Sequence, residues 1–493
     1  MDDPIRESGG HLAALLELGG DGPPYRQITD ALKRAIDRGE ISLGTVLPPE
    51  RTLASELSVS RSTVVTAYER LKAEGWLESR QGSGTWVRRP EPGQTADAAS
   101  TSRLFISERA QDPAPPRLRP EDDIVDLSVA AVMGSSTIVD VMSSVTPEDA
   151  RALTAQHGYA PAGLRELRHT VAQQMADRGL TTTDDQLLIT TGAQQAIWVI
   201  ARQHLQPGDT VLVESPTFPG ALDAFRAIGA RMIPLPVDAH GVRTELLDDL
   251  VDRLQPRLLF LSTHFHSPTG SVLPAERRAE VAEVAARSRL AVIEDETMVD
   301  LNLDDIATPA PIAALAPEGP IHTVGSAAKL FWAGLRVGWV RVPEGSVTRI
   351  LASKTVTDLG SSMISQLLAL RMMHRREEII RERRSELVPQ RDMLCRLLAE
   401  HLPDWNFEVP PGGLSLWVGL PEGNAEEFAE VAARHGVAIV PGPALSVDEG
   451  NRRGIRVVFA RDEEILVEGV RRLTAAWGSY APSVTRSVSR LLV

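Results

Sequence analysis

The sequence contains little cysteine, few aromatic residues and no long apolar run. Its single cysteine among 493 residues, Cys395, cannot form an internal disulfide, which is typical of a reducing compartment. No uninterrupted apolar stretch of about 18 residues is present to span a bilayer. The first residues, MDDPIRESGG, lack the basic and apolar regions of a signal peptide. We therefore expect a cytoplasmic protein without a membrane partner.

The charge of the chain is distributed unevenly. The net charge of −14 at pH 7 argues at first against a polyanionic partner. Residues 23–89, however, hold eleven Lys or Arg and eight Asp or Glu, a local net charge of +3. The remainder of the chain therefore carries −17, and only the N-terminal part suits nucleic acid. A length of 493 residues predicts two to four domains.

Residues 23–89 predict three helices followed by two short strands. The first helix has one apolar face, made by Tyr25, Ile28, Leu32 and Ile36. The second begins at LPPER, and the third follows Ser60, a suitable N-cap, with Val64, Tyr68 and Leu71 as its buried stripe. WLESRQGSGTWV predicts a β-hairpin. This order is typical of a winged helix-turn-helix. In such a domain two helices joined by a tight turn form a pair, and the second helix of that pair enters the major groove of double-stranded DNA.

Polar residues lie where such a domain would contact DNA. Arg61, Ser62 and Thr63 begin the third helix, where backbone NH groups favour phosphate and short side chains can reach base edges. Arg51 in the second helix can hold a phosphate, and Gly82 allows close approach of the wing. Over about sixty-five residues the segment resembles the GntR family. That resemblance implies DNA contacts by Arg51, Ser60, Arg61, Ser62, Thr63 and Gly82. Pro49 departs from the pattern, which usually has a small polar residue there.

The chain around this domain divides into further parts. Residues 1–22 are predicted to be a flexible leader, and residues 90–122, rich in Pro, Ala, Ser, Asp and Gln, a linker between bodies that move relative to one another. From residue 123 to residue 493, short apolar strands alternate with helices, which predicts an α/β domain with a mostly parallel sheet. Residues 351–493 are expected to contribute most of a smaller α+β subdomain.

Four kinds of residue in the α/β region suit pyridoxal 5′-phosphate (PLP). This cofactor needs a lysine, a carboxylate against the pyridine nitrogen, phosphate donors and a stacking aromatic ring. GSAAKLFWAGLR offers Lys329 with Ser326 and Arg336 as phosphate donors, and LAVIED ends in Asp295. ITTGAQQA predicts a strand, a turn and a helix start. Its residues Gly192, Ala193 and Gln194 can present NH groups to a phosphate, and ESPTFPG supplies Phe218.

The order of these motifs resembles that of fold-type I PLP aminotransferases, from about Ile124 to the end. Together with the N-terminal domain, the chain resembles the MocR/GabR subfamily of GntR regulators. The resemblance implies that Tyr159 reaches the phosphate of a neighbouring subunit in a homodimer, and that Arg456 binds a substrate carboxylate.

The match departs from the aminotransferase pattern on one side of the cofactor. Ser267 stands where an asparagine is usual, and Thr297 and Met298 where a tyrosine is expected. The two usual residues donate hydrogen bonds to the cofactor's phenolic oxygen. His264 and His266 could compensate, but an ordinary structural role for each is an equally good interpretation.

Three functions fit these observations. The first is a regulator that binds PLP and senses an amine, an amino acid or PLP itself to control promoter binding. The second is an active aminotransferase that carries a DNA-binding domain. The third is a DNA-binding dimer in which the aminotransferase fold is only a scaffold. The linker and the winged helix favour the first, whereas Lys329, Asp295 and Arg336 argue against the third. No metal site is expected.

Overall fold

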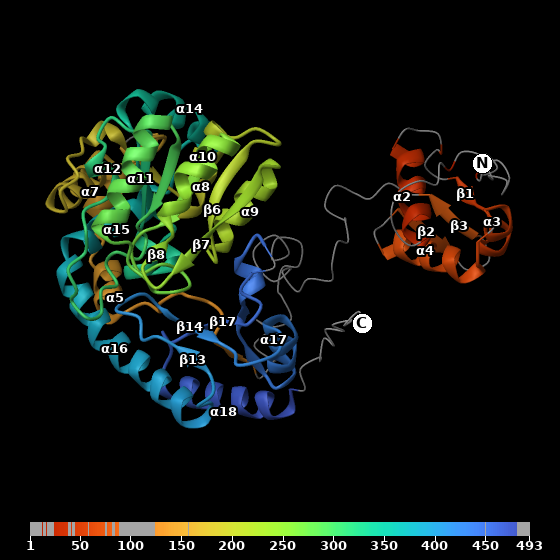
Figure 1. Cartoon of the computed structure of the whole chain (residues 1–493). Helices are drawn as coiled ribbons and strands as arrows, with labels where there is room; N and C mark the ends of the chain where they lie inside the picture. Colours follow the sequence, from red (N-terminus) through yellow and green to blue (C-terminus); the bar gives the residue numbers. More distant parts are fainter. Residues whose placement is uncertain are drawn as a thin grey trace. The chain divides into compact units, whose positions relative to one another are not determined.

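The computed structural model describes residues 24–37, 45–57, 59–73, 76–80, 84–87, 124–155, 157–448 and 450–480, together with Leu12, Leu16 and Ile41. The chain divides into two compact units, Met1–Ser100 and Thr101–Val493, whose elements Figure 1 labels along the sequence. The predicted linker 90–122 lies outside the described residues, so its boundaries stay a prediction. Among the described residues, no helix is long and apolar enough to cross a membrane.

The N-terminal unit contains the predicted helices and hairpin. Its helices are α2 (Pro24–Asp37), α3 (Glu50–Glu56) and α4 (Arg61–Ala73). The strands β2 (Leu77–Arg80) and β3 (Gly84–Val87) pair antiparallel as the wing. A short strand that the sequence analysis did not predict, β1 (Val46–Leu47), pairs with the other edge of β3. Two residues show too little periodicity to identify a strand, so only the tertiary pairing defines β1.

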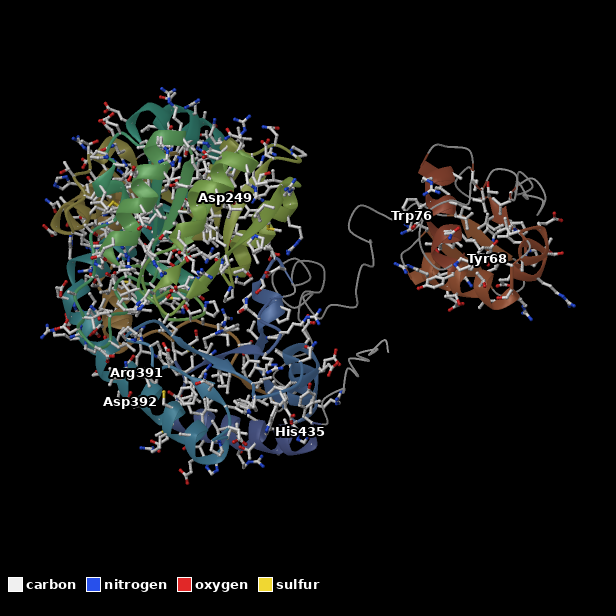
Figure 2. All side chains as sticks on the ribbon, viewed as in Figure 1. Tyr68, Trp76, Asp249, Arg391, Asp392 and His435 are labelled. Atoms are coloured by element: carbon white, nitrogen blue, oxygen red, sulfur yellow. The ribbon has the colours of Figure 1, made fainter. Side chains whose placement is uncertain are left out.

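The core of this unit confirms the predicted helix faces. Ile28, Leu32, Val64 and Leu71 are fully buried. Tyr68, which Figure 2 labels in this unit, is also buried, and its hydroxyl donates a hydrogen bond to the carbonyl oxygen of Pro48 at 3.0 Å. This bond joins α4 to the segment before α3.

The prediction that residues 1–22 form a flexible leader outside the domain is wrong for two residues. Leu12 and Leu16 are buried in the same apolar core as α2 and α4. Their backbones are joined by a hydrogen bond from Leu16 N to Leu12 O at 3.1 Å, the spacing of a helical turn. Burial of two leucines in this small core favours their fixed position, because it removes their apolar surface from water.

The larger unit is built on an eight-stranded sheet that is mostly parallel, as predicted. Its order is β5-β12-β11-β10-β9-β6-β7-β8. The central neighbours are parallel, and β12 pairs antiparallel with both β11 and β5. The strands are β5 (Leu187–Thr190), β6 (Thr210–Ser215), β7 (Arg231–Asp238), β8 (Gly241–Val242), β9 (Leu258–Ser262), β10 (Ala291–Asp295), β11 (Ile321–Ser326) and β12 (Gly338–Arg341).

Apolar cores cover both faces of this sheet. Along β9, Leu258 and Phe260 belong to one core, and Leu259 and Leu261 to the other, because successive side chains alternate between faces. The surrounding helices, several of which Figure 1 labels, are α5 (Ser136–Ser143), α6 (Pro147–Thr154), α7 (Arg165–Asp177), α8 (Ala193–His204), α9 (Pro219–Ile228), α10 (Leu247–Leu254), α11 (Ala275–Ser288), α12 (Ile312–Leu315), α13 (Ala327–Leu330), α14 (Val347–Asp358) and α15 (Met363–His374).

A smaller antiparallel sheet of order β13-β14-β17-β16 forms the C-terminal part of this unit. Its strands are β13 (Asn406–Phe407), β14 (Ser415–Gly419), β16 (Val440–Pro441) and β17 (Gly454–Val458), and the helices of this part are α16 (Arg376–His401), α17 (Ala425–Arg434) and α18 (Glu463–Ser479). Two chain-distant strands, β4 (Val125–Asp126) and β15 (Val437–Ala438), pair in parallel.

The predicted start of the smaller subdomain at residue 351 is too early. Helix α14 packs against α8 and α15 packs against α7, so both belong to the larger sheet layer. Conversely, β4 joins the C-terminal part through β15, although it lies near residue 125. Helices α15 and α16 are separated at Arg375. Local periodicity could not reveal these packing partners.

Candidate functional site

The predicted cofactor residues converge on one cavity of about 330 Å³ at the carboxyl ends of the central strands. In open α/β sheets this edge is the usual place for ligands. The cavity walls include these predicted residues: Ala193, Gln194, Phe218, Ser267, Asp295, Ser326, Lys329, Arg336 and Arg456. Residues that are up to 263 positions apart in the sequence thus meet at one site.

Lys329 lies in α13, directly after β11. Its Nζ donates a hydrogen bond to the carbonyl oxygen of Ala130 at 2.8 Å. Burial of the ammonium group, together with the positive charge of Arg456, lowers the pKa of Lys329 to about 8, although Asp295 acts in the opposite direction. A lysine with this pKa is partly neutral near physiological pH, and the neutral amine is the nucleophilic form.

Asp295 is the last residue of β10 and is buried. One of its carboxylate oxygens accepts a hydrogen bond from the backbone NH of Thr297 at 2.8 Å. Burial raises the pKa of this carboxyl, whereas the hydrogen bonds from Thr297 and the charge of Lys329 oppose the rise. The carboxylate therefore lies in an environment where a cationic partner would be strongly favoured.

An anion cradle lies at the start of α8. Gly192 precedes this helix with φ +77°, and no side chain caps the helix. The first NH groups of a helix attract anions, and here Ala193 and Gln194 supply them at the cavity wall. Arg336 lines the same wall and donates from Nη2 to the carbonyl oxygen of Thr191 at 3.0 Å.

Ser326 and Phe218 complete the walls. The Ser326 hydroxyl accepts a hydrogen bond from Ala328 N at 3.1 Å and so caps α13, which fixes it beside Lys329. Phe218 precedes α9, and a Cβ atom on Gly220 would lie only 2.6 Å from its ring. Gln194 donates to the carbonyl oxygen of Gly220 at 2.6 Å. These contacts hold the aromatic ring and the start of α8 together.

Arg456 lies in β17 and is buried. Its Nη2 donates to the carbonyl oxygen of Ser128 at 2.6 Å, and its Nε has no hydrogen-bond partner within the described part of the chain. Burial lowers the pKa of Arg456 to about 10, which the carboxylate of Asp126 partly offsets. A guanidinium with an unused buried donor is well suited to bind a carboxylate.

The side of the cavity that departs from the aminotransferase pattern is lined by Ser267, Thr297 and Met298. Neither histidine belongs to the residues that line the cavity. The ring of His264 lies 3.4 Å from Glu296 Oε1 and 3.2 Å from Arg278 Nη2, and burial lowers its pKa to about 3.

His266 Nδ1 lies 2.8 Å from Thr269 Oγ1. The Nε2 atom of His266 lies 3.4 Å from Glu214 Oε2. Because neither histidine lines the cavity, the geometry does not support the idea that either replaces the missing donors.

Two further predicted residues lie apart from this wall. Gly192 does not line the cavity but supports Arg336, because a Cβ atom on Gly192 would stand 2.9 Å from Arg336 Nη2. Tyr159 is outside the cavity of its own chain and 66% of its side chain is exposed. Such exposure is compatible with the predicted role of Tyr159 across a subunit boundary, which remains a prediction.

The sequence analysis missed the backbone segment from Ser128 to Ala131, which lines the cavity. These residues contribute carbonyl groups, and backbone groups leave no pattern in a sequence. Ser262 was also missed, although its position at the end of β9 is the signal that could have identified it.

In the N-terminal unit, the predicted DNA-contacting side chains Arg51, Ser60 and Arg61 are exposed. Ser60 caps α4, because its hydroxyl accepts a hydrogen bond from Thr63 N at 3.1 Å. The backbone of Ser62 is helical, but its side chain and the whole of Gly82 lie outside the described residues.

Comparison with known families agrees with both units. Residues 122–473 match the model of aminotransferase class I and II, and residues 24–87 match that of the bacterial regulatory proteins of the gntR family. The chain belongs to the MocR type of GntR regulators, in which a helix-turn-helix domain is fused to a class I and II aminotransferase domain. A GntR domain implies DNA binding, and this aminotransferase family typically binds PLP. The MocR-type chain is therefore a transcriptional regulator with an aminotransferase-like domain.

This chain is similar to regulators over nearly its whole length and to an aminotransferase over about two thirds of it. The uncharacterized HTH-type transcriptional regulator YdfD of Bacillus subtilis (strain 168) is 29% identical, over 90% of this chain and 94% of its own. The probable rhizopine catabolism regulatory protein MocR of Rhizobium meliloti is 27% identical, over 94% and 95%. A 2-aminoadipate transaminase of Thermus thermophilus is 32% identical, over 65% and 79%.

Among solved structures, kynurenine aminotransferase of Pyrococcus horikoshii has a TM-score of 0.67 and 27% identity, and the match covers 78% of this chain and 99% of the other.

Proposed function

We propose that this regulator binds PLP covalently through Lys329 and senses an amine, an amino acid or PLP itself, so that occupancy of the cavity controls promoter binding. The observation that supports the proposal is the convergence of Lys329, Asp295 and Arg456 on one cavity that also has an anion cradle. Lys329 offers an amine for the covalent bond, Asp295 a carboxylate for the protonated ring nitrogen, and Arg456 a guanidinium for the carboxylate of a ligand.

The residues present fit PLP. A cavity of about 330 Å³ is within the range of small-molecule sites. The uncapped start of α8 and the guanidinium of Arg336 would hold the phosphate, and the close approach of Arg336 to Gly192 leaves no room there for a Cβ atom. Asp295 would hold the ring nitrogen in its protonated form, and Phe218 would stack on the ring.

The chain's own groups determine what a bound cofactor could do. Bound PLP supplies an aldehyde carbon that bonds to amines and a ring that withdraws electrons. Lys329 provides the amine, and its lowered pKa keeps part of it neutral. Arg456 would orient an incoming amino acid through its carboxylate, because its Nε is an unused donor. Ser267 and Thr297 offer only short hydroxyls on the opposite side.

We infer that the regulator acts as a homodimer. Large apolar side chains are exposed on and beside α5 and at the start of α15, two helices that pack together. They are Met133, Val139, Met142, Val145 and Ile364. Contiguous exposed apolar surface is typical of an interface between subunits. Sedimentation analysis is expected to give a dimer, and Val139→Asp with Ile364→Asp is expected to give monomers.

An active aminotransferase is the second candidate. It is favoured by the presence of Lys329, Asp295, Arg336 and Arg456 in one cavity. The substitution of the two phenolic-oxygen donors counts against efficient turnover. The same residues also argue against a purely structural scaffold, because a scaffold has no need of a half-buried lysine in one cavity with a buried aspartate.

The proposal is tested by fixing the cofactor in place. The chain has four lysines, Lys33, Lys72, Lys329 and Lys354. Treatment with PLP and borohydride, followed by peptide mass spectrometry, is expected to label Lys329 alone. Lys329→Ala should lose both the label and the visible absorbance, whereas the control Lys72→Ala should keep them. A label that persists on another lysine would move the site. Affinity for an operator should change when PLP and amino acids are added.

A further inference from the structure

A short backbone segment at the start of the larger unit is held by hydrogen bonds from cationic side chains, two of which line the cavity. We call residues Asp126–Ala131 the strap. Each of its six consecutive carbonyl oxygens accepts at least one hydrogen bond. Five of the carbonyls accept a bond from one of three cationic side chains, Lys329, Arg456 and Arg461, and that of Val129 also accepts from the backbone NH of Ala131 at 2.9 Å. The sixth, from Leu127, accepts from the backbone NH of Val458 at 2.9 Å.

The three cations divide into two kinds. Lys329 holds the carbonyl of Ala130 at 2.8 Å, and Arg456 holds that of Ser128 at 2.6 Å; both cations line the cavity. Arg461 does not line it. Its guanidinium holds three carbonyls of the strap, those of Asp126 at 2.9 Å, Val129 at 2.7 Å and Ala131 at 3.3 Å, and also the carbonyl of Ala460 at 2.6 Å.

The proposed ligands bind the same two cations that hold the strap. A Lys329 nitrogen that is bonded to the cofactor no longer has the ammonium donor that it now gives to Ala130. A carboxylate on Arg456 Nε draws the same guanidinium that holds the carbonyl of Ser128 through Nη2, and a charged acceptor forms a stronger hydrogen bond with a guanidinium than a carbonyl does. Occupancy of the cavity therefore removes or weakens two of the five cationic bonds, and those of Arg461 remain.

The strap lies next to the segment of chain that leads to the DNA-binding unit, so a change in how the strap is held affects the start of that segment. The strap starts within β4, the first strand of the larger unit, and residues 90–122 precede it on the way from the DNA-binding unit. A ligand can shift an equilibrium only through a differential interaction with its two states. Here the differential interaction is the loss of the Lys329 bond to Ala130, together with a weaker Arg456 bond to Ser128, when ligand groups bind these two cations.

We propose that the strap is the element through which occupancy of the PLP cavity is transmitted to the chain that leads to the DNA-binding unit, with Arg461 as its positioning residue. The inference rests on the proposed function and deepens it by naming the route of regulation. Arg461 sets how firmly the strap is held, whereas Lys329 and Arg456 make the hold depend on the ligand.

The test uses the full chain and an operator duplex that is selected with it from random-sequence DNA. Operator affinity is measured without ligand and with PLP plus a mixture of the twenty standard amino acids. The variant is Arg461→Met, which keeps an apolar stem and loses the three strap bonds. The matched control is Arg453→Met, because Arg453 is exposed and donates to Pro421 rather than to the strap.

In the wild type and in Arg453→Met, we expect the ligands to change operator affinity by at least about fivefold, the lower end of ordinary coupling between two sites. In Arg461→Met, the ratio of the two affinities should fall to within about twofold of one. The PLP absorbance spectrum should stay as in the wild type. A ratio in Arg461→Met equal to that of the wild type would overturn the role of the strap.

Hydrogen–deuterium exchange on the wild type gives a second measurement, which decides the matter even if Arg461→Met does not fold. With PLP alone as the probe, peptides that cover Asp126–Ala131 should exchange faster than without it, because Lys329 leaves the carbonyl of Ala130. Peptides from α11 should not change. Unchanged or slower exchange in the strap would refute the inference. By contrast, a wild type that takes up no PLP, or whose operator affinity ignores all ligands, contradicts the proposed function itself.

Discussion

The guanidinium of Arg336 and the backbone of Gly192 are in close contact at the anion cradle. A Cβ atom on Gly192 would stand 2.9 Å from Arg336 Nη2, and Gly192 has φ +77°. Gly192→Ala should therefore displace Arg336 as well as strain the backbone, at a cost of about 1–3 kcal/mol for this glycine-only backbone conformation alone. We expect PLP to bind at least about tenfold more weakly, which corresponds to about 1.4 kcal/mol. Absorbance titration with PLP measures this.

Gly208→Ala is the matched control for that substitution. Gly208 also has a positive φ, +90°, but no atom of the described part of the chain lies within 4 Å of the position of its Cβ atom. It shares the positive φ and lacks the contact with Arg336. Gly208→Ala should lower the melting temperature and leave PLP affinity unchanged. Equal loss of PLP affinity in both variants would mean that the cradle is not the phosphate site.

Cofactor uptake should depend on pH through Lys329. Because its pKa is lowered to about 8, the neutral amine fraction should rise about tenfold per pH unit below that value and level off above it. An ordinary lysine would level off only above about pH 10.4. The rate at which absorbance appears after mixing with PLP, followed from about pH 6 to about pH 10, tests this.

The same reaction with a free lysine derivative, after division by the neutral-amine fraction of that derivative, corrects for the titration of the cofactor's own groups. A corrected rate that still rises tenfold between about pH 9 and about pH 10 would show that the environment of Lys329 does not lower its pKa.

Direct contact with DNA should depend on Arg61, whereas cofactor binding should not. Arg61 is exposed at the first position of α4. A base-contacting arginine contributes about 1–3 kcal/mol, so Arg61→Ala should weaken operator binding by roughly ten- to a hundredfold. Arg70→Ala, in the last turn of the same helix, is the control and should have a smaller effect. Gel-shift titration at matched salt measures both, and the PLP spectrum should be unaffected. Undiminished affinity of Arg61→Ala would place the recognition surface elsewhere.

Amino-group transfer should be slow compared with ligand binding. Ser267, Thr297 and Met298 line the side of the cavity where two hydrogen-bond donors to the cofactor are usual. Loss of one hydrogen bond to a charged oxygen typically costs about 1.5–3 kcal/mol. With amino acids and an acceptor keto acid, we expect spectral changes but few turnovers by mass spectrometry. Repeated turnover near the enzyme median of about 10 per second would favour the aminotransferase. Ser267→Asn should raise the rate, and Ser271→Asn, in the same turn, should not.

Much of the fold follows from local patterns. The stripe Val64, Tyr68 and Leu71 and the N-cap at Ser60 follow from helical spacing and capping chemistry, and the structure confirms them. The alternation of short apolar runs and helices likewise predicts a mostly parallel sheet. Because strand ends collect at one edge of such a sheet, Asp295 and the lysine after β11 could be assigned to one site before their contacts were known.

Other features depend on contacts between residues that are distant in the sequence. The motif around His264 does not reveal that its ring lies against Glu296 and Arg278 rather than in the cavity. The leader gives no sign that Leu12 and Leu16 enter a core. The sequence analysis missed the strap because every residue has a backbone carbonyl group, so the sequence does not mark the carbonyls that accept hydrogen bonds from Lys329, Arg456 and Arg461.

By itself, then, the sequence determined which chemical groups the protein has and in which elements they lie, since side-chain type and periodicity are local properties. Only the tertiary structure decided which groups share a cavity and which donors hold the backbone beside Lys329. The physical reason is that a hydrogen bond between Arg461 and Asp126 depends on the packing of segments 335 residues apart, and no local preference encodes that packing.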